Sequence, residues 1–565
     1  MKPTSVSIAS GRIAVRPSFA DLLICPRIGG TWDGSIGAWM FPATEQYAGT
    51  LRNKLRAICA TDEFELLLFP PPSTSAEVVP LNQPAEAAVV APAPDVVPGE
   101  PEPDVKVPDG MMTSPWRHQK TAFRFCLDHF ATGLRGVLLA MGMGTGKSLV
   151  ACMLVLALLA RRVLICCPLR VVPVWVTQFE RHVGIPVVIV PLDEDAGSVA
   201  RKTELAANKL KLAQASGVPF IAVINYDSAW REPFAGWAEK VNWDLVIADE
   251  AHRLKAPGGK ASLFFKRLRL RTTHRVALTG TPMPHGPMDV YAVFRFLEVS
   301  IFGPSFSAFR QKYAVMGGYQ KKQITGFQKL DDLERLMSRI TFRVGKEVLD
   351  LPPETSTTYH CDLTPEAARI YRDLEEDFVA RVMDGTVTAA NAMVKLLRLQ
   401  QVTGGCVPTD DGTTHRVDSG KQKLLADTLE DIGTDEPVVA FCRFHADLDA
   451  VHEACDSTGC SSLELSGRRD ELKRWQEGEA QVLAVQIDSG GEGVDLTRAR
   501  YSIFYSVGFS LGKYEQAKAR THRPGQNKPV THIHLVARNT VDVKIMRALE
   551  KRADIVQAIL AEIKN

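Results

Sequence analysis

The chain holds eleven cysteines but lacks any CxxC pair. That scatter argues against a zinc site and against a disulfide framework. Cys166 and Cys167 are adjacent inside an apolar run, so their side chains are expected to point to opposite faces of a strand. We therefore expect reduced, buried thiols.

The sequence also lacks a segment suited to secretion or to a membrane. Its first residues, MKPTSVSIASGRIAVRPSF, contain no apolar core of a signal peptide. The longest apolar stretch, LVACMLVLALLA at 149–160, is shorter than the roughly 20 residues that a membrane span needs. We interpret it as a buried helix, and we expect an intracellular protein with no membrane partner.

A charge excess of one sign is missing too. The 67 Lys and Arg residues and 65 Asp and Glu residues leave a net charge of +2. Any affinity for nucleic acid must therefore come from local basic clusters. Apolar residues make up 45% and charged residues 23%, an ordinary globular balance, and 565 residues suggest three or four domains.

Residues 70–110 are rich in proline, alanine, valine and acids, and contain no aromatic residue. Such a composition predicts an extended, disordered linker. It would separate a small N-terminal module, residues 1–69, from the main body of the chain.

The main body alternates short β-branched runs with helical patterns, which predicts buried parallel strands. The first series of runs lies at 161–167, 218–224, 243–249 and 274–280. The second lies at 437–442, 480–487, 499–506 and 529–537. We predict an α/β fold of two doubly wound parallel-sheet lobes, 111–300 and 419–565, with a helical inter-lobe region, 301–418, and a small α+β module at the N-terminus.

Residues 141–148, Met-Gly-Met-Gly-Thr-Gly-Lys-Ser, stand between an apolar run and an apolar helix, which is the context of a phosphate-binding loop. The backbone N–H groups of Gly144, Thr145 and Gly146 would face the phosphates of ATP. Lys147 would neutralise phosphate charge, and Ser148 would ligate Mg²⁺. The strict pattern fails at Met141, and the alternative is a glycine-rich turn that precedes a lysine.

Asp249 and Glu250 end the apolar run WDLVI. An acid at the carboxyl edge of a parallel strand points into the ligand crevice. Asp249 would therefore hold Mg²⁺, and Glu250 would orient and deprotonate the attacking water. The alternative for an Asp-Glu pair is a solvated turn.

From residue 111 to the end, the sequence resembles the Swi/Snf-type ATPase branch of superfamily-two helicases. The motifs occur in the family's order, and they are Trp116-Arg117-His118-Gln119, Cys167-Pro168-Leu169 followed by Trp175, Ile224-Asn225-Tyr226, the DEAHRLK run at 249–255, LTGTP at 278–282, Ser466-Gly467, SGGEGVDL at 489–496 and QAKARTHRPGQ at 516–526.

This resemblance implies roles for further residues. Gln119 would read adenine, and Gly493 would contact ATP. Thr279, Gly280, Thr281 and Gln516 would couple hydrolysis to movement. Arg523 would be the arginine finger, with Arg520 as a γ-phosphate or coupling contact; such fingers are worth about 10³–10⁵ in rate. Their spacing of three would put both on one face of a helical turn. The alternative is two surface arginines in a basic turn.

Residues 253–275 hold eight Lys or Arg residues and no acid. Because the run follows the DEAH motif, we expect it to contact DNA phosphates without reading sequence. The alternative is a solvated basic face. The expected DNA contacts are Arg253, Lys255, Lys266 and Arg267, together with backbone groups of Ser489, Gly490 and Gly491.

The N-terminal module contains Trp32, Asp33, Trp39, Phe41 and Pro42. Their pattern resembles the HARP module that accompanies annealing helicases, which implies binding to forked or branched DNA through stacking on unpaired bases. The alternative is that both tryptophan rings only fill a small core.

We therefore expect an ATP- and Mg²⁺-dependent translocase on double-stranded or forked DNA that remodels or reanneals strands. Two alternatives stay open: a strand-separating helicase on DNA or RNA–DNA hybrids, and an ATP-gated nucleic-acid-binding scaffold. Nothing in the sequence predicts a protein partner.

Overall fold

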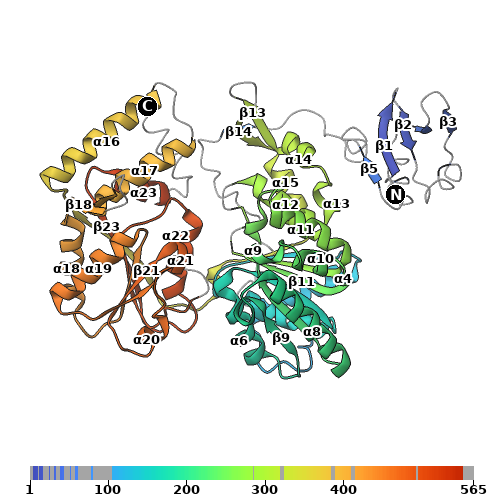
Figure 1. Ribbon diagram of the computed structural model, residues 1–565, viewed down its shortest axis with the longest axis horizontal. Helices are drawn as coiled ribbons and strands as arrows, with labels where there is room; N and C mark the ends of the chain where they lie inside the picture. Colours follow the sequence, from blue (N-terminus) through green and yellow to red (C-terminus); the bar gives the residue numbers. More distant parts are fainter. Residues whose placement is uncertain are drawn as a thin grey trace.

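The structure is a computed structural model, and it describes residues 105–280, 282–283, 286–317, 323–383, 389–408, 414–490 and 494–550. It also describes residues 4–9, 12–16, 25, 31–33, 38–42, 51, 58–60 and 78–80. Two large α/β lobes lie side by side, and a small N-terminal sheet lies beyond the first lobe (Figure 1).

The first lobe is built on a seven-stranded, entirely parallel sheet in the order β15-β7-β12-β11-β8-β10-β9. Every residue of the central strands β7 and β10 is buried, because helices cover both faces. The strands are β7 Gly136–Met141, β8 Arg162–Cys167, β9 Val188–Pro191, β10 Phe220–Asn225, β11 Trp243–Asp249, β12 Thr272–Thr279 and β15 Thr341–Val344.

The two faces of this sheet carry separate cores. Helices α4 (Arg117–Ala131), α5 (Lys147–Ala157) and α6 (Val172–His182) pack on the face that buries Cys167. Helices α8 (Val199–Ser216), α11 (Lys260–Leu268) and α12 (Val290–Leu297) pack on the face that buries Cys166. The adjacent cysteines thus point to opposite faces, as predicted. The longest apolar stretch forms the buried helix α5, and no helix in the described part of the chain has the length and apolar character of a membrane span.

The second lobe contains a six-stranded parallel sheet in the order β16-β23-β22-β19-β21-β20. Two apolar cores cover its two faces. The strands are β16 Glu354–Cys361, β19 Val438–Cys442, β20 Ser462–Leu465, β21 Val482–Gln486, β22 Tyr501–Phe504 and β23 Val530–Ala537. The helices include α16 Pro365–Met383, α17 Ala389–Thr403, α18 Gly420–Ile432, α19 His445–Thr458, α22 Leu511–Thr521 and α23 Val541–Glu550. The predicted fold class is therefore confirmed.

The region predicted as an inter-lobe segment, 301–418, is divided between the two sheets. Strand β15 pairs with β7 and extends the first lobe to Val344. Strand β16 pairs with β23 and starts the second lobe at Glu354. Helices α16 and α17 add Tyr371 and Leu396 to the core of the second lobe. The β16 residues are mostly exposed and polar, which explains why no buried run marks this strand in the sequence.

The N-terminal strands form a five-stranded sheet in the order β3-β4-β2-β1-β5. They are β1 Thr4–Ala9, β2 Arg12–Arg16, β3 Thr31–Asp33, β4 Ala38–Pro42 and β5 Ile58–Ala60. Trp32 and Trp39 are register partners on the antiparallel pair β3–β4, and Phe41 is buried. Within the predicted linker, β6 (Val78–Pro80) pairs with β14 (Gln323–Gln328), which in turn pairs with β13 (Ala314–Gly317); residues 81–104 lie outside the described residues.

Candidate nucleotide site between the two lobes

The phosphate-loop sequence forms the predicted strand–loop–helix unit, β7 to α5. Gly144 and Gly146 adopt left-handed backbone conformations with φ of 80° and 82°. The Lys147 Nζ donates to the carbonyl oxygens of Met141 at 2.9 Å and Gly142 at 3.2 Å. Ser148 follows as the second residue of α5 and is half-buried. The Lys147 side chain thus bonds to the carbonyl groups of its own phosphate loop.

Helix α4 braces this loop through Gln119. The Gln119 Nε2 donates to Thr145 O at 3.0 Å, and its Oε1 accepts from Trp116 N at 2.8 Å. A Cβ atom on Gly146 would lie 2.1 Å from that Nε2, so the loop tolerates only glycine there. Both ends of the Gln119 amide are bonded within the protein, and its contact with adenine stays a prediction.

Asp249 and Glu250 occupy the carboxyl end of β11. The Asp249 Oδ2 accepts from the Trp175 indole N–H at 3.0 Å, and its Oδ1 accepts from Glu250 N at 3.0 Å. The Tyr226 hydroxyl donates to Asp249 O at 2.8 Å. Glu250 has a φ of 51°, and its Oε2 lies 3.3 Å from His252 Nδ1. The two acids are therefore held by different partners.

Their electrostatic environments differ accordingly. Burial and the neighbouring charge of Glu250 raise the pKa of Asp249 to about 6. Burial also opposes ionisation of Glu250, but the contact with His252 and the charges of Lys147 and Arg520 outweigh it and lower its pKa. Burial lowers the pKa of Lys147, although both acids oppose that effect. Of the two acids, Glu250 is the better-stabilised carboxylate.

The oxygens at this site fit Mg²⁺. Burial disfavours the carboxylate of Asp249 as a bare anion, and the Ser148 hydroxyl is the second oxygen ligand predicted for the ion. Among the described residues, no group of three or more His, Cys, Asp or Glu side chains is arranged to hold a metal. Mg²⁺ commonly binds through one or two protein ligands plus substrate phosphates, which is what these two residues offer.

The second lobe reaches the phosphate loop directly. A Cβ atom on Gly144 would lie 2.8 Å from Pro524 Cδ and 3.6 Å from Arg523 Cβ. The charges of Arg520 and Arg523 contribute to lowering the pKa of Lys147, after burial. Arg523 Nη1 donates to Val494 O at 3.3 Å. The structure therefore brings both predicted arginines to the nucleotide site.

Arg520 and Arg523 do not share one helical face, contrary to the prediction from their spacing. Helix α22 ends at Thr521, and Arg523 lies in the turn beyond it. The cause is Pro524, because the residue before a proline is disfavoured in helical conformation. Only Arg520 is on the helix itself.

The residues predicted to couple hydrolysis to movement are partly described. Thr279 is buried at the end of β12, and a Cβ atom on Gly280 would lie 3.6 Å from Met141 O. Gln516 is half-buried on α22.

Of the residues predicted to contact DNA through their backbone, Ser489 and Gly490 end α21 (Ile487–Gly490). The remaining predicted residues, Thr281, Gly491 and Gly493, lie outside the described residues.

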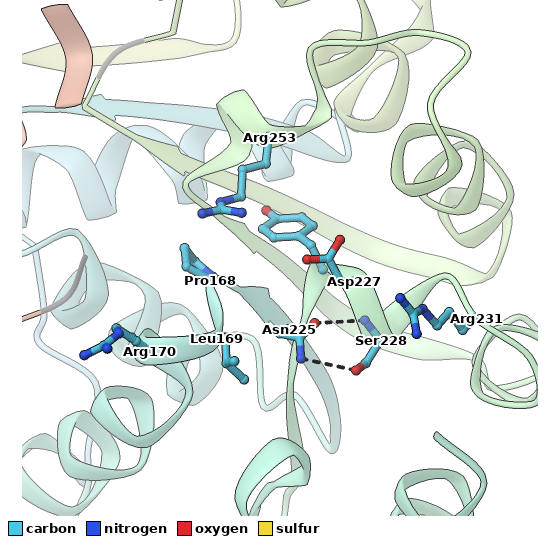
Figure 2. Close-up of a pocket in the computed structure, with 9 residues that line it drawn as sticks. Pro168, Leu169, Arg170, Asn225, Asp227, Ser228, Arg231 and Arg253 are labelled. Atoms are coloured by element: carbon cyan, nitrogen blue, oxygen red, sulfur yellow. Dashed lines mark hydrogen bonds between the residues drawn. The ribbon is translucent and has the colours of Figure 1, made fainter. Parts of the chain in front are cut away.

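A cavity of about 400 Å³ opens at the carboxyl ends of β8, β10 and β11. Arg253 reaches across one side of it, with Asp227 and Arg231 opposite Pro168 and Leu169 (Figure 2). Arg170 extends away from its centre and donates to Ser466 O of the second lobe at 3.1 Å. Three arginines thus border one cavity, and one of them, Arg170, also contacts the second lobe.

Beneath the cavity lies a buried polar network. Asn225 N donates to Asp193 Oδ2 at 2.6 Å, and Asn225 Oδ1 accepts from Ser228 N at 2.8 Å. Lys202 pairs with Asp193 and donates to Ser228 Oγ at 2.9 Å. These bonds fix the floor of the cavity, because every member is engaged by another.

The basic run at 253–275 does not form a single surface. Arg253 borders the cavity and Lys255 is half-buried, whereas Lys266 and Arg267 are exposed on α11. Arg267 donates to Glu239 at 2.7 Å. Arg275, at the far end, is buried 3.7 Å from Glu298.

Trp175, Arg170 and Arg231 lie at these sites although their sequence pattern predicted no role for them. Trp175 and Arg170 follow β8 and Arg231 follows β10. The sequence signal for these residues is that they follow predicted parallel strands, at whose carboxyl ends ligands bind. What the sequence could not supply was the direction in which each side chain points.

Comparisons with known proteins agree with this arrangement. The model of the SNF2-related domain matches residues 118–405, and that of the helicase conserved C-terminal domain matches residues 420–525. Together these ranges contain the phosphate loop, the acids and the arginine turn.

The chain is 23% identical over 485 residues to the DNA repair and recombination protein RDH54 of Saccharomyces cerevisiae, covering 76% of this chain and 52% of the relative. The chain thus spans about half the length of that protein. It is 26% identical to putative protein p41 of Acyrthosiphon pisum secondary endosymbiont phage 1, covering 60% of this chain and 77% of the relative.

Among solved structures, the Sulfolobus solfataricus SWI2/SNF2 ATPase core in complex with dsDNA matches with a TM-score of 0.38 and 22% identity, covering 81% of this chain and 96% of that one. From its two matching domains and the seam that they share, the chain belongs to the SNF2-related family of helicase-like ATPases.

Proposed function

We propose that this chain hydrolyses ATP in the seam between its lobes and uses the cycle to move along double-stranded DNA. The observation that carries the proposal is the meeting of Gly144 with Arg523 and Pro524. It brings residues of both lobes to one nucleotide site. Hydrolysis then depends on lobe closure, and closure and reopening supply the step.

Each residue at the seam has a distinct task in this proposal. Lys147 leaves its loop carbonyls to bind the phosphates of ATP. Glu250, whose pKa is lowered, accepts a proton from the attacking water. Arg520 and Arg523 stabilise the charge that develops on the transferred phosphoryl group. Gln119 holds the loop and contacts adenine.

Ser148 and Asp249 are the proposed ligands of Mg²⁺. When bound, this ion neutralises phosphate charge and orients the phosphates. Asp249 is kept in place by the Trp175 indole and by Glu250 N.

The cavity bordered by Arg170, Arg231 and Arg253 supports the DNA part of the proposal. Guanidinium groups pair well with phosphate oxygens, and contacts to backbone phosphates carry no sequence information. Lys255, Lys266 and Arg267 would extend the contact, as would the backbone of 489–491. We infer duplex binding that is independent of sequence.

ATP turnover with duplex, fork, single-stranded DNA and RNA tests the central claim. We expect stimulation by duplex, and its loss in Lys147→Ala and Glu250→Gln, with ATP still bound by Glu250→Gln. Glu436→Gln, at an acid whose ion-pair partners are Arg500 and Lys528, is the matched acid control. Stimulated turnover retained in both site variants would reject the site.

Two further assays distinguish movement along duplex DNA from separation of its strands. Displacement of a triplex-forming strand without separation of the duplex supports translocation. Strand separation on DNA or an RNA–DNA hybrid would instead support a true helicase. DNA binding that changes with ATP but without turnover would support a gated scaffold.

We further propose that the N-terminal module directs the motor to forked or branched DNA, where it reanneals strands. Its resemblance to the HARP module and the register pairing of Trp32 with Trp39 support this. Affinities for a fork and for a plain duplex should differ in the full chain and converge without residues 1–69. Equal affinities in the full chain would reject the proposal.

A further inference from the structure

The lobes are joined by a short segment, residues 345–353, that begins against the phosphate loop. Gly142 N donates to Val344 O at 2.7 Å. A Cβ atom on Gly142 would lie 3.1 Å from Gly345 C, and one on Gly144 would lie 3.5 Å from Leu349 Cδ1. The inter-lobe segment therefore lies beside the nucleotide site along much of its length.

The other end of the segment meets helix α22, which carries Arg520 and is followed by Arg523. Glu354, the first residue of β16, lies 2.5 Å from Lys518 Nζ and 2.7 Å from His522 Nδ1. It also lies 3.4 Å from His532 Nε2 on β23. One carboxylate thus contacts α22 at Lys518, the residue just beyond α22 at His522, and the neighbouring strand.

His522 is held from both sides. Its Nε2 lies 2.8 Å from Pro352 O, within the inter-lobe segment, while its Nδ1 faces Glu354. His522 directly precedes Arg523 and follows Arg520 by two residues. The position of this ring therefore constrains both arginines through the backbone of one turn.

The Glu354 carboxylate is well suited to hold His522 in place. The contacts with His532 and Lys518 hold the pKa of Glu354 well below its usual range. The side chain is 25% exposed, while those of Lys518 and His522 are 14% and 10% exposed. A mostly buried ion cluster with several partners is geometrically restrictive, unlike a single surface pair. Within the described part of the chain, the ion-pair partners of Glu354 are Lys518, His522 and His532, and none of them is Lys147, Asp249 or Glu250.

We propose that Glu354 is a positioning residue for the arginine turn. It ties the inter-lobe segment, which begins at the phosphate loop, to the end of α22, where Arg520 lies, and to the turn that holds Arg523, so that a shift of the loop is transmitted to both arginines. The inference rests on the proposed hydrolysis in the seam.

Glu354→Gln, measured in the full chain, tests this assignment. The amide keeps the size of the side chain and removes its charge. We expect kcat for DNA-stimulated turnover to fall on the order of 10- to 100-fold, because small misplacements of a catalytic group carry such costs. The affinity for ATP in equilibrium binding should change less than about twofold, since no ATP contact is lost.

The matched control is Glu436→Gln. Glu436 is also a partly buried acid of the second lobe with two cationic partners, Arg500 at 3.1 Å and Lys528 at 3.3 Å. It should leave kcat unchanged. Thermal unfolding shows whether Glu354→Gln is folded. If it is not, Lys518→Gln serves as the second variant, because it removes another ionic contact of Glu354. We expect it to lower kcat in the same way.

A double-mutant cycle on kcat with Arg523→Lys decides whether Glu354 acts through the arginine. If it does, the double variant should lose less activity than the product of the two single losses. Multiplicative losses, or a Glu354→Gln variant as active as Glu436→Gln, would overturn the inference. If Arg523→Lys alone keeps full turnover, the proposed seam chemistry fails instead, so the two failures are distinct.

Discussion

The indole N–H of Trp175 donates to the Oδ2 of Asp249 across 3.0 Å, within the buried end of the first sheet. This bond comes from α6 and fixes the acid that is proposed to hold Mg²⁺. Without it, Asp249 would be buried with fewer donors than its charge requires.

Trp175→Phe should therefore impair turnover more than folding. The phenyl ring keeps most of the apolar packing, while the lost donor destabilises the fold by about 1–2 kcal/mol and lowers kcat roughly tenfold. The measurements are ATP turnover and urea unfolding. Trp243→Phe is the matched control, because Trp243 is equally buried in the same lobe and donates to Ala238 O at 2.9 Å. Equal turnover in the two variants would contradict the role given to Trp175.

Gly146→Ala should abolish ATP binding. The new methyl would lie 2.1 Å from Gln119 Nε2 at a φ of 82°, so the Gln119 amide must move away from Thr145 O and the loop backbone is strained. We expect ATP affinity to fall by at least about 100-fold, close to 3 kcal/mol. Gly217→Ala has a similar positive φ of 68° but nothing within 4 Å, so it should cost about 1 kcal/mol of stability and leave ATP binding intact. Normal ATP affinity in Gly146→Ala would show that the loop does not contact nucleotide as proposed.

Arg253→Ala should weaken DNA binding in a salt-dependent way. Loss of one phosphate contact should reduce the slope of log affinity against log salt by about 1, uniformly across DNA sequences. Fluorescence anisotropy at several salt concentrations measures this slope. Arg201→Ala, an exposed arginine on α8, should leave it unchanged. An unchanged slope in Arg253→Ala would remove the cavity from the DNA interface.

His534 should make the second lobe sensitive to mild acid. Burial lowers its pKa to about 4, although the bond to Thr357 O opposes this. The Tyr514 hydroxyl lies 2.9 Å from Nε2, and Nδ1 lies 3.2 Å from Thr357 O, so one neutral tautomer fills both bonds. Since the unfolded chain protonates near pH 6.5 and the folded one near 4, stability should be fully present above 6.5 and fall between these values.

The expected loss is on the order of 2–3 kcal/mol between pH 6.5 and 4. Urea unfolding at closely spaced pH values measures it, with His534→Gln as the comparison, because the amide does not titrate. A wild-type profile parallel to that of His534→Gln across this range would contradict the prediction. His415→Gln, at an exposed position in the same lobe, should leave the profile unchanged.

The sequence predicted the eight buried strands of the two lobes well, because each is an apolar run such as WDLVIAD at β11. It missed β9, β15 and β20, which are only four residues long, and β16, which is mostly exposed. The phosphate loop and the Asp-Glu pair were found because their local context is encoded in adjacent residues. Glu354 and the cluster of Lys518, His522 and His532 could not be found, since parallel pairing of β16 with β23 brings together residues that are about 180 apart.

The late position of β15 has a consequence for folding and for domain excision. The strand that shields the edge of β7 is not available until Val344 has been synthesised, long after β7 itself. A fragment cut at residue 300, where the sequence alone suggests a boundary, would leave the fully apolar run Gly136–Met141 as an unpaired border, open to strand addition from another molecule. Recombinant pieces of the first lobe should therefore extend beyond residue 344 to stay monomeric.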